Sequence, residues 1–158
     1  MINIKTIIKN VFLFLSILFF WLLGGLLFKI DFSFYKELNL PFFTLNPKLI
    51  GIIWFIIYIL ISLSILKVSK TTNVLKNKDY LYILITNYIS NQVFLYFFFN
   101  LKSPFLGFCI TTIIFASSII LLKETKKISI KAYYLLLPYI IYNTYALILM
   151  TSVYFMNF

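Results

Sequence analysis

Histidine and arginine are absent from this 158-residue chain, and cysteine occurs only once, at Cys109. A single cysteine has no partner for an internal disulfide. Without histidine, the chain lacks the most frequent general base of enzymes and the usual proximal ligand of haem iron. The acidic residues, Asp31, Glu37, Asp79 and Glu124, all lie between apolar segments. We therefore expect no catalytic residues and no bound metal.

Charge is scarce as well, with 11% of residues charged and 63% hydrophobic. A soluble domain is typically about one-quarter charged. All charged residues fall outside five apolar segments, each close to the ~20 residues that cross a bilayer. Backbone groups in lipid must be satisfied within the segment, so each segment is predicted to be a helix. The sequence thus predicts an all-α membrane protein, a single bundle of five transmembrane helices near residues 11–28, 49–66, 80–99, 105–122 and 133–155.

The first segment has a second interpretation, because Lys5 and Lys9 precede it as in a secretory signal peptide. However, its apolar run exceeds the about 7–15 residues of a signal peptide. Bulky residues also surround its only small pair, Gly24-Gly25. A membrane-spanning helix is therefore the preferred interpretation.

The positions of the lysines predict an orientation. Ten lysines lie before the first segment or in the second and fourth connections, and four lie in the first and third. Lysine is enriched on the cytoplasmic side of membrane proteins, which predicts a cytoplasmic N-terminus and an external C-terminus. Abundant Lys, Asn, Ile, Phe and Tyr with little Ala indicate an AT-rich bacterial genome and hence a bacterial cell membrane. The net charge of +10 is then a topology signal, with anionic lipid as a secondary partner and no nucleic acid expected.

Prolines mark two helix starts and one interruption. Asn46-Pro47 and Ser103-Pro104 read as an N-cap followed by proline at the first helical position. Pro138 lies inside the fifth segment. It removes a backbone donor there and should kink the helix, which frees a carbonyl for a neighbour or a ligand.

The third segment places polar side chains near the middle of the membrane. Asn87, Ser90, Asn91 and Phe94 share one helix face, and Gln92 follows directly. Amides are costly in hydrocarbon unless they are paired, so they must point toward other helices or a cavity. Hydrogen bonding between helices and ligand binding explain this face equally well.

The fifth segment carries a second such face, formed by Tyr139, Tyr142, Asn143 and Ala146. Tyrosine and asparagine offer polar groups there, and alanine leaves space. Aromatic packing with an interfacial tyrosine belt is the alternative, although Tyr139 and Tyr142 lie deep for a belt.

The connection between the first two segments is neither short nor polar. It contains two aromatic pairs and two prolines, and it leads to Trp54 and Tyr58, one helical turn apart. These residues place aromatic rings and prolines at the mouth of whatever the helices enclose. The pairs and prolines are Phe34-Tyr35, Pro41, Phe42-Phe43 and Pro47.

Together these patterns resemble the translocator protein family, also called the tryptophan-rich sensory protein (TspO/MBR) or peripheral-type benzodiazepine receptor family. Its first connection reads W-Y-x-x-L-x-x-P-x-W-x-P-P and leads to W-x-x-L-Y. Phe34-Tyr35, Leu38, Pro41 and Phe43 occupy the loop positions here, and Trp54 and Tyr58 the helix positions.

Two further motifs of that family have counterparts in the third and fifth segments. The family's L-N-[WY] corresponds to Thr86-Asn87-Tyr88, and the N-Q of some bacterial members to Asn91-Gln92. P-Y-x-x-W-x-x-x-A corresponds to Pro138-Tyr139, Tyr142 and Ala146. The resemblance spans nearly the whole chain.

The chain also departs from the family pattern. Phe34, Phe43 and Tyr142 replace tryptophans, and Leu45-Asn46 replaces the proline pair. No basic residue follows Tyr154, so the cholesterol-recognition pattern of animal members is incomplete.

The resemblance implies a five-helix bundle, often dimeric, that binds a porphyrin or another flat hydrophobic molecule between its helices beneath the first connection. It implies no required cofactor; a metal-free tetrapyrrole is favoured over haem, which would be held without a histidine bond. Lys36 or Lys48 could meet propionates, although each also reads as a solvated surface lysine. The implied ligand-binding residues are Tyr35, Pro41, Phe43, Trp54, Tyr58, Asn87, Asn91, Gln92, Pro138, Tyr139, Tyr142, Asn143 and Ala146.

Three other functions are weighed against ligand binding. A small transporter of amphiphiles would need repeat halves or a charge within the membrane, and neither is visible. A stress-regulatory membrane scaffold would leave the pocket incidental. Light-dependent porphyrin breakdown, known in some members of the family, relies on pocket tryptophans of which Trp54 alone is kept, so any such activity should be weak.

Overall fold

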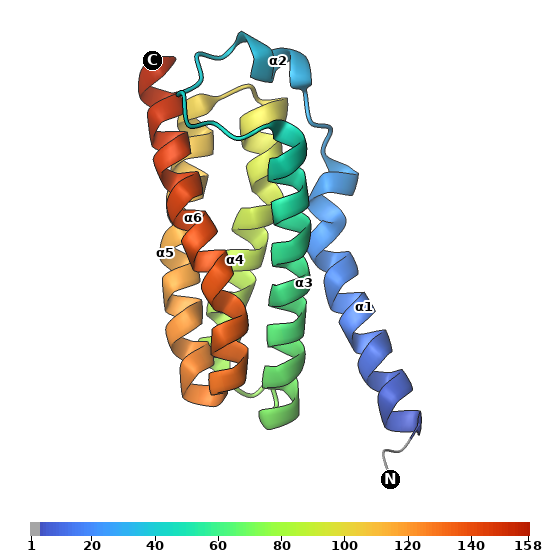
Figure 1. The fold of residues 1–158 in the computed structure, drawn as a ribbon. Helices are drawn as coiled ribbons and strands as arrows, with labels where there is room; N and C mark the ends of the chain where they lie inside the picture. Colours follow the sequence, from blue (N-terminus) through green and yellow to red (C-terminus); the bar gives the residue numbers. More distant parts are fainter. Residues whose placement is uncertain (1–3) are drawn as a thin grey trace.

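A computed structural model describes residues 4–158, which form helices and the segments that connect them, without strands. Five long helices are apolar enough to cross a membrane over this range. They stand side by side, and a short helix lies across one end (Figure 1). The long helices are α1 (Ile4–Leu27), α3 (Pro47–Thr71), α4 (Lys78–Leu95) with its π-helical extension η1 (Tyr96–Asn100), α5 (Pro104–Ile128) and α6 (Ile130–Met156); α2 (Phe32–Glu37) is the short one.

The predicted fold class and the five membrane helices are confirmed. α3, α4, α5 and α6 extend past the apolar segments, and polar side chains cap their N-terminal ends. Asn46 accepts a hydrogen bond from the backbone N–H of Lys48, and Ser103 accepts one from Leu106, as the two Asn/Ser-Pro pairs predict. Ser129 caps α6 in the same way, and α6 continues through Pro138 as one helix.

The order of the helices around the bundle differs from their order in the chain. α1 packs against α3 and α4, α3 against α6, and α5 against both α4 and α6. The ring is therefore α1, α3, α6, α5, α4. The N-terminal half of α1 diverges from the bundle (Figure 1), and the residues of α1 that are buried, Trp21 and Gly24, lie in its C-terminal half.

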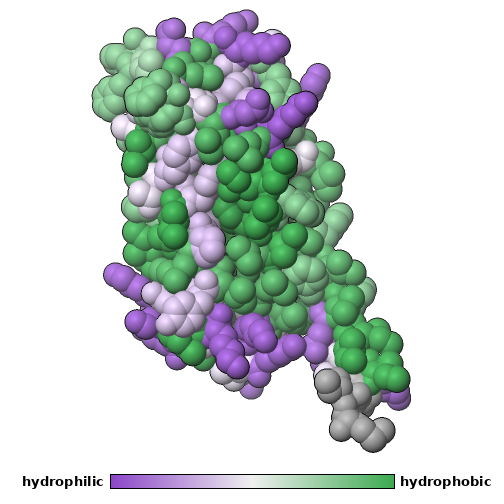
Figure 2. Space-filling model, in the orientation of Figure 1, coloured by the Kyte–Doolittle hydropathy of each residue, from purple (hydrophilic) through white to green (hydrophobic). Residues whose placement is uncertain are grey.

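Apolar side chains surround the bundle as expected for contact with lipid. On the face drawn in Figure 2, hydrophobic residues form a band between polar residues at the two ends. Exposed residues of this kind include Phe12, Phe55 and Ile141. The protein is accordingly an integral membrane protein.

The interior is filled at the end away from α2. A cluster of side chains that are each at most 2% exposed lies there: Ile61, Val68, Tyr80, Leu121 and Leu136. The interior under α2 is different, because it contains a cavity.

Candidate ligand-binding cavity

The cavity has a volume of about 280 Å³ and lies under α2, where all five long helices contribute to its wall. The C-terminal parts of α1, α4 and α6 meet the N-terminal parts of α3 and α5 at this end. Among the described residues, no charged side chain lines it. Its surface is therefore suited to an apolar ligand with few polar groups.

Aromatic rings make up much of the wall. Trp54 and Tyr58 come from α3, and the other rings come from α2, α4 and η1. The Trp54 ring meets the Tyr142 ring edge-to-face, with centroids 5.4 Å apart and an interplanar angle of 89°. Tyr142 thus supports Trp54 from outside the cavity. The remaining aromatic lining residues are Phe32, Tyr35, Phe94, Phe98 and Phe99.

The π-helical turn η1 brings two adjacent phenylalanines to the cavity. A π turn widens the helix, so Phe98 and Phe99 both line the cavity, one turn closer to α2 than Phe94 and Leu95. Phe98 is 2% exposed, stacks on Phe94 at 5.6 Å, and meets Phe34 of α2 edge-to-face. The π turn therefore shapes the cavity wall and also provides the surface on which α2 packs.

A polar network closes the floor of the cavity. The Tyr139 hydroxyl donates to Oδ1 of Asn87 at 2.9 Å and accepts from Nδ2 of Asn91 at 2.8 Å. Nδ2 of Asn87 donates to the Ser117 hydroxyl at 2.8 Å and to the carbonyl of Ile114 at 3.2 Å. Asn87 is thus used in holding α4, α5 and α6 together, while Asn91 lines the cavity.

Two polar side chains at the cavity have no hydrogen-bond partner among the described residues. Both amide atoms of Asn143 are unpaired although the residue is 1% exposed, and the buried hydroxyl of Tyr35 is unpaired too. Burial raises the pKa of that Tyr35 hydroxyl. Leaving a buried polar group unpaired costs about 1–3 kcal/mol, so these atoms favour a bound polar group.

The connection from α2 to α3 is fastened to α6. The Tyr145 hydroxyl donates to the carbonyl of Phe43 at 3.3 Å and accepts from the N–H of Leu45 at 3.1 Å. Asn39 and Asn157 bond reciprocally: the Asn39 N–H donates to Oδ1 of Asn157 at 2.8 Å, and Nδ2 of Asn157 donates to the carbonyl of Asn39 at 2.9 Å.

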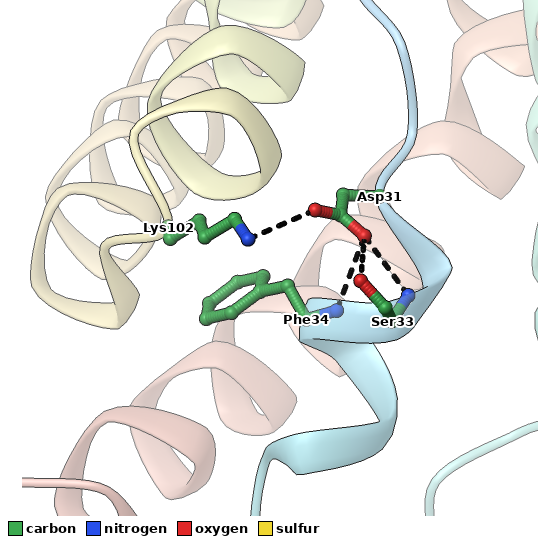
Figure 3. A network of polar contacts seen from close by, with 4 residues as sticks. All are labelled: Asp31, Ser33, Phe34 and Lys102. Carbon is green, nitrogen blue, oxygen red and sulfur yellow. Dashed lines mark hydrogen bonds and ion pairs between the residues drawn. The ribbon is translucent and has the colours of Figure 1, made fainter.

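An ion pair holds the N-terminal end of α2 to the α4–α5 connection (Figure 3). Nζ of Lys102, in the α4–α5 connection, lies 3.1 Å from Oδ2 of Asp31. Oδ1 of Asp31 accepts from the hydroxyl of Ser33 and from the N–H groups of Ser33 and Phe34, which caps α2. The Ser33 hydroxyl, Lys102 and the Phe34 N–H hold the pKa of the Asp31 carboxyl well below its usual range.

The mouth of the cavity lies between α1 and α3, beside α2. Gly25, Ile30, Phe32, Pro47 and Gly51 line the cavity and are also exposed. A Cβ at Gly25 or Gly51 would meet no heavy atom within 4 Å. The cavity therefore opens sideways where α1 and α3 lack side chains.

The predicted site residues fall into two groups. Six of them line the cavity: Tyr35, Trp54, Tyr58, Asn91, Asn143 and Ala146.

The other seven lie outside it. Asn87 and Tyr139 form the floor network. Gln92 bonds to the backbone of α1, accepting from Gly24 and donating to the carbonyl of Trp21. Phe43 packs against Tyr145. Pro41 is buried in the α2–α3 connection, and Pro138 is exposed on α6. Tyr142 packs against the side of Trp54 that faces away from the cavity.

Sequence reasoning missed Phe98, Phe99, Gly25 and Gly51 as lining residues. The Phe97–Phe99 run was a signal for an aromatic wall, but its register depends on a π turn that no sequence pattern marked. The two glycines sit in apolar segments where small residues have several uses.

The sequence also matches known proteins. The model of the TspO/MBR family matches residues 12–156. The chain belongs to the TspO/MBR family. Among its TspO/MBR relatives, it is 36% identical over 134 residues to the "uncharacterized membrane protein YtaB" of Bacillus subtilis, covering 85% of this chain and 86% of the relative. It is 31% identical over 148 residues to the "tryptophan-rich protein TspO" of Bacillus cereus, covering 90% of this chain and 96% of the relative.

Proposed function

We propose that this TspO/MBR protein binds a flat, largely apolar tetrapyrrole of the porphyrin class in the cavity under α2. The observation that carries this proposal is an uncharged cavity with aromatic walls. A π face of the macrocycle stacks on rings such as Trp54, and its apolar edge lies among the uncharged side chains of the cavity.

The carboxylates of such a ligand belong at the mouth. No charged side chain is available to them among the described lining residues, and burying an unpaired carboxylate is strongly unfavourable. Lys29 and Lys48 are exposed and adjoin Ile30 and Pro47, which line the mouth. These two lysines are therefore the proposed partners of the carboxylates, in preference to Lys36 on α2.

The volume of the cavity supports the same placement. About 280 Å³ is near the lower limit of ligand pockets, which are typically about 300–1,000 Å³. A porphyrin therefore has its apolar edge inside, and its carboxylate edge projects through the gap at Gly25 and Gly51. Because the chain has no histidine, the proposed ligand is metal-free.

A shape-based comparison tests the proposal. Ala146 lines the cavity, whereas Ala116 is exposed to lipid on α5. Ala146→Phe should fill the cavity and weaken protoporphyrin binding at least tenfold, measured by absorbance titration in nanodiscs. Ala116→Phe makes the same chemical change and should bind like the wild type. Equal affinities for the two variants would disprove binding in this cavity.

The closed floor favours a binding protein over a channel or transporter. The cavity occupies one end of the bundle, and the other end is packed with fully buried side chains such as Ile61 and Leu121. Flux of protoporphyrin into proteoliposomes should therefore equal that of protein-free vesicles. Protein-dependent flux would support the transporter instead.

We also propose that the N-terminus faces the cytoplasm and that the cavity lies near the external surface. The lysine distribution supports this orientation. Reporter fusions in the α3–α4 connection and after Phe158 should report cytoplasmic and external locations, respectively. The reverse result would show that the protein has the opposite orientation in the membrane.

A further inference from the structure

The amide of Asn143 is unusual because nothing in the described chain satisfies it. It projects from α6 into the cavity, is 1% exposed, and has no hydrogen-bond partner at either Oδ1 or Nδ2. The hydroxyl of Tyr139 lies near Asn143, but its hydrogen bonds, at 2.9 and 2.8 Å, are made with Asn87 and Asn91. The other amides of the bundle interior are used: Asn87 and Asn91 bond within the floor, and Gln92 bonds to α1.

We propose that Asn143 selects ligands that carry a hydrogen-bond donor beside an acceptor on one neutral, planar edge, as a lactam does. A side-chain amide presents its oxygen and its N–H in one plane. It therefore pairs with such an edge through two parallel hydrogen bonds, as asparagine does with adenine. The inference rests on the proposed function, because it concerns the same cavity.

A neutral partner follows from the surroundings of Asn143. The cavity has no charged side chain among the described residues that line it, and Ala146, Leu149 and Met150 of α6 are lining neighbours. A carboxylate would be left without a counter-charge there. A simple pyrrole N–H offers a donor only and would leave the Asn143 nitrogen unpaired, whereas a lactam satisfies both atoms.

A matched pair of small planar molecules tests this selection. Phenanthridinone is a flat three-ring lactam, and its N-methyl derivative keeps the shape and the carbonyl but lacks the donor. The wild-type protein in nanodiscs should bind phenanthridinone about 10- to 100-fold more tightly than the N-methyl derivative, as expected when a buried site loses a hydrogen-bond partner. Equal affinities would overturn the inference.

Two variants link the selection to Asn143. Asn143→Leu should bind both compounds alike, and without ligand it should melt at a higher temperature than the wild type, because an unpaired amide is removed. Thr144→Leu replaces the neighbouring lipid-exposed residue and should retain the preference for the lactam. A lower melting temperature for Asn143→Leu without ligand would instead show a structural role for the amide, and it would overturn the inference.

The outcome is separable from that of the porphyrin proposal. If protoporphyrin binds and Ala146→Phe blocks it, but the two phenanthridinones bind alike, the lactam selection alone is wrong. If protoporphyrin does not bind while the lactam preference depends on Asn143, the cavity and its selection stand and the tetrapyrrole class is wrong.

Discussion

The hydroxyl of Tyr139 and the side-chain oxygen of Asn87 lie 2.9 Å apart, and both residues are completely buried. This bond joins α6 to α4 directly beneath the cavity. Asn87 has all of its polar atoms paired within the bundle, and it does not line the cavity. The position of Asn87 therefore favours hydrogen bonding between helices over ligand binding for this residue.

Tyr139→Phe should accordingly affect folding more than binding. It removes one donor from Asn87 and one acceptor from Asn91, which should destabilise the protein by about 1–2 kcal/mol. Thermal unfolding in detergent measures the loss. Tyr142→Phe, which removes a hydroxyl without a described hydrogen bond from the same helix, is the matched control and should change stability little. An equal loss of stability in Tyr142→Phe would show that removing a tyrosine hydroxyl from α6 destabilises the protein whether or not it belongs to this network.

The adjacent glycines of α1, Gly24 and Gly25, should respond differently to substitution by alanine. A Cβ at Gly24 would lie 2.9 Å from Oε1 and 3.3 Å from the backbone oxygen of Gln92, whereas a Cβ at Gly25 meets no heavy atom within 4 Å. Gly24→Ala should therefore push α1 from α4 and destabilise the protein by about 1–3 kcal/mol.

Gly25→Ala is the control, and it should be neutral in the same unfolding measurement. Similar melting temperatures for both variants would contradict the close approach of α1 and α4 at Gly24.

The ion pair between Asp31 and Lys102 should hold α2 in place over a wide pH range. The pKa of Asp31 is lowered in the folded protein, so its contribution is complete above the unfolded pKa, about 3.9, and is lost only as the pH falls through the lower folded value. The ligand dissociation rate should thus show no Asp31-dependent change between pH 5 and pH 8.

Lys102→Met removes the ion pair and keeps the Asp31 cap of α2. Exposed ion pairs are weak, so we expect this variant to release protoporphyrin only about two- to fivefold faster in stopped-flow measurements. A rate that rises in the wild type as the pH falls from 8 to 5, and does not in Lys102→Met, would contradict the assigned pKa shift.

The helices could be predicted from the sequence because the signals for them are local. Each apolar segment is long enough to span the membrane, and Asn46 and Ser103 mark helix starts by their own side chains. Trp54, Asn91 and Asn143, which the sequence predicts as ligand-binding residues, line the cavity, and their part in binding stays a prediction.

Sequence reasoning could not separate Asn87 from Asn91, one turn apart on the same face. Their roles depend on where Ser117 and Tyr139 of other helices lie, which is a property of the packed bundle. The mouth at Gly25 and Gly51 likewise depends on α1 and α3 being neighbours in the ring. Helix periodicity contains no information on that order.

The most direct test of the central claim is the affinity of protoporphyrin for two tryptophan variants. Trp54 lines the cavity, whereas Trp21 is buried behind Tyr58 with ring centroids 5.7 Å apart. Loss of the Trp54 indole should weaken binding about five- to tenfold through lost aromatic contact, so Trp54→Phe should bind clearly more weakly and Trp21→Phe within twofold of the wild type. Titration by porphyrin absorbance reports both affinities independently of tryptophan emission. Equal affinities for Trp54→Phe and the wild type would contradict a tetrapyrrole bound against Trp54.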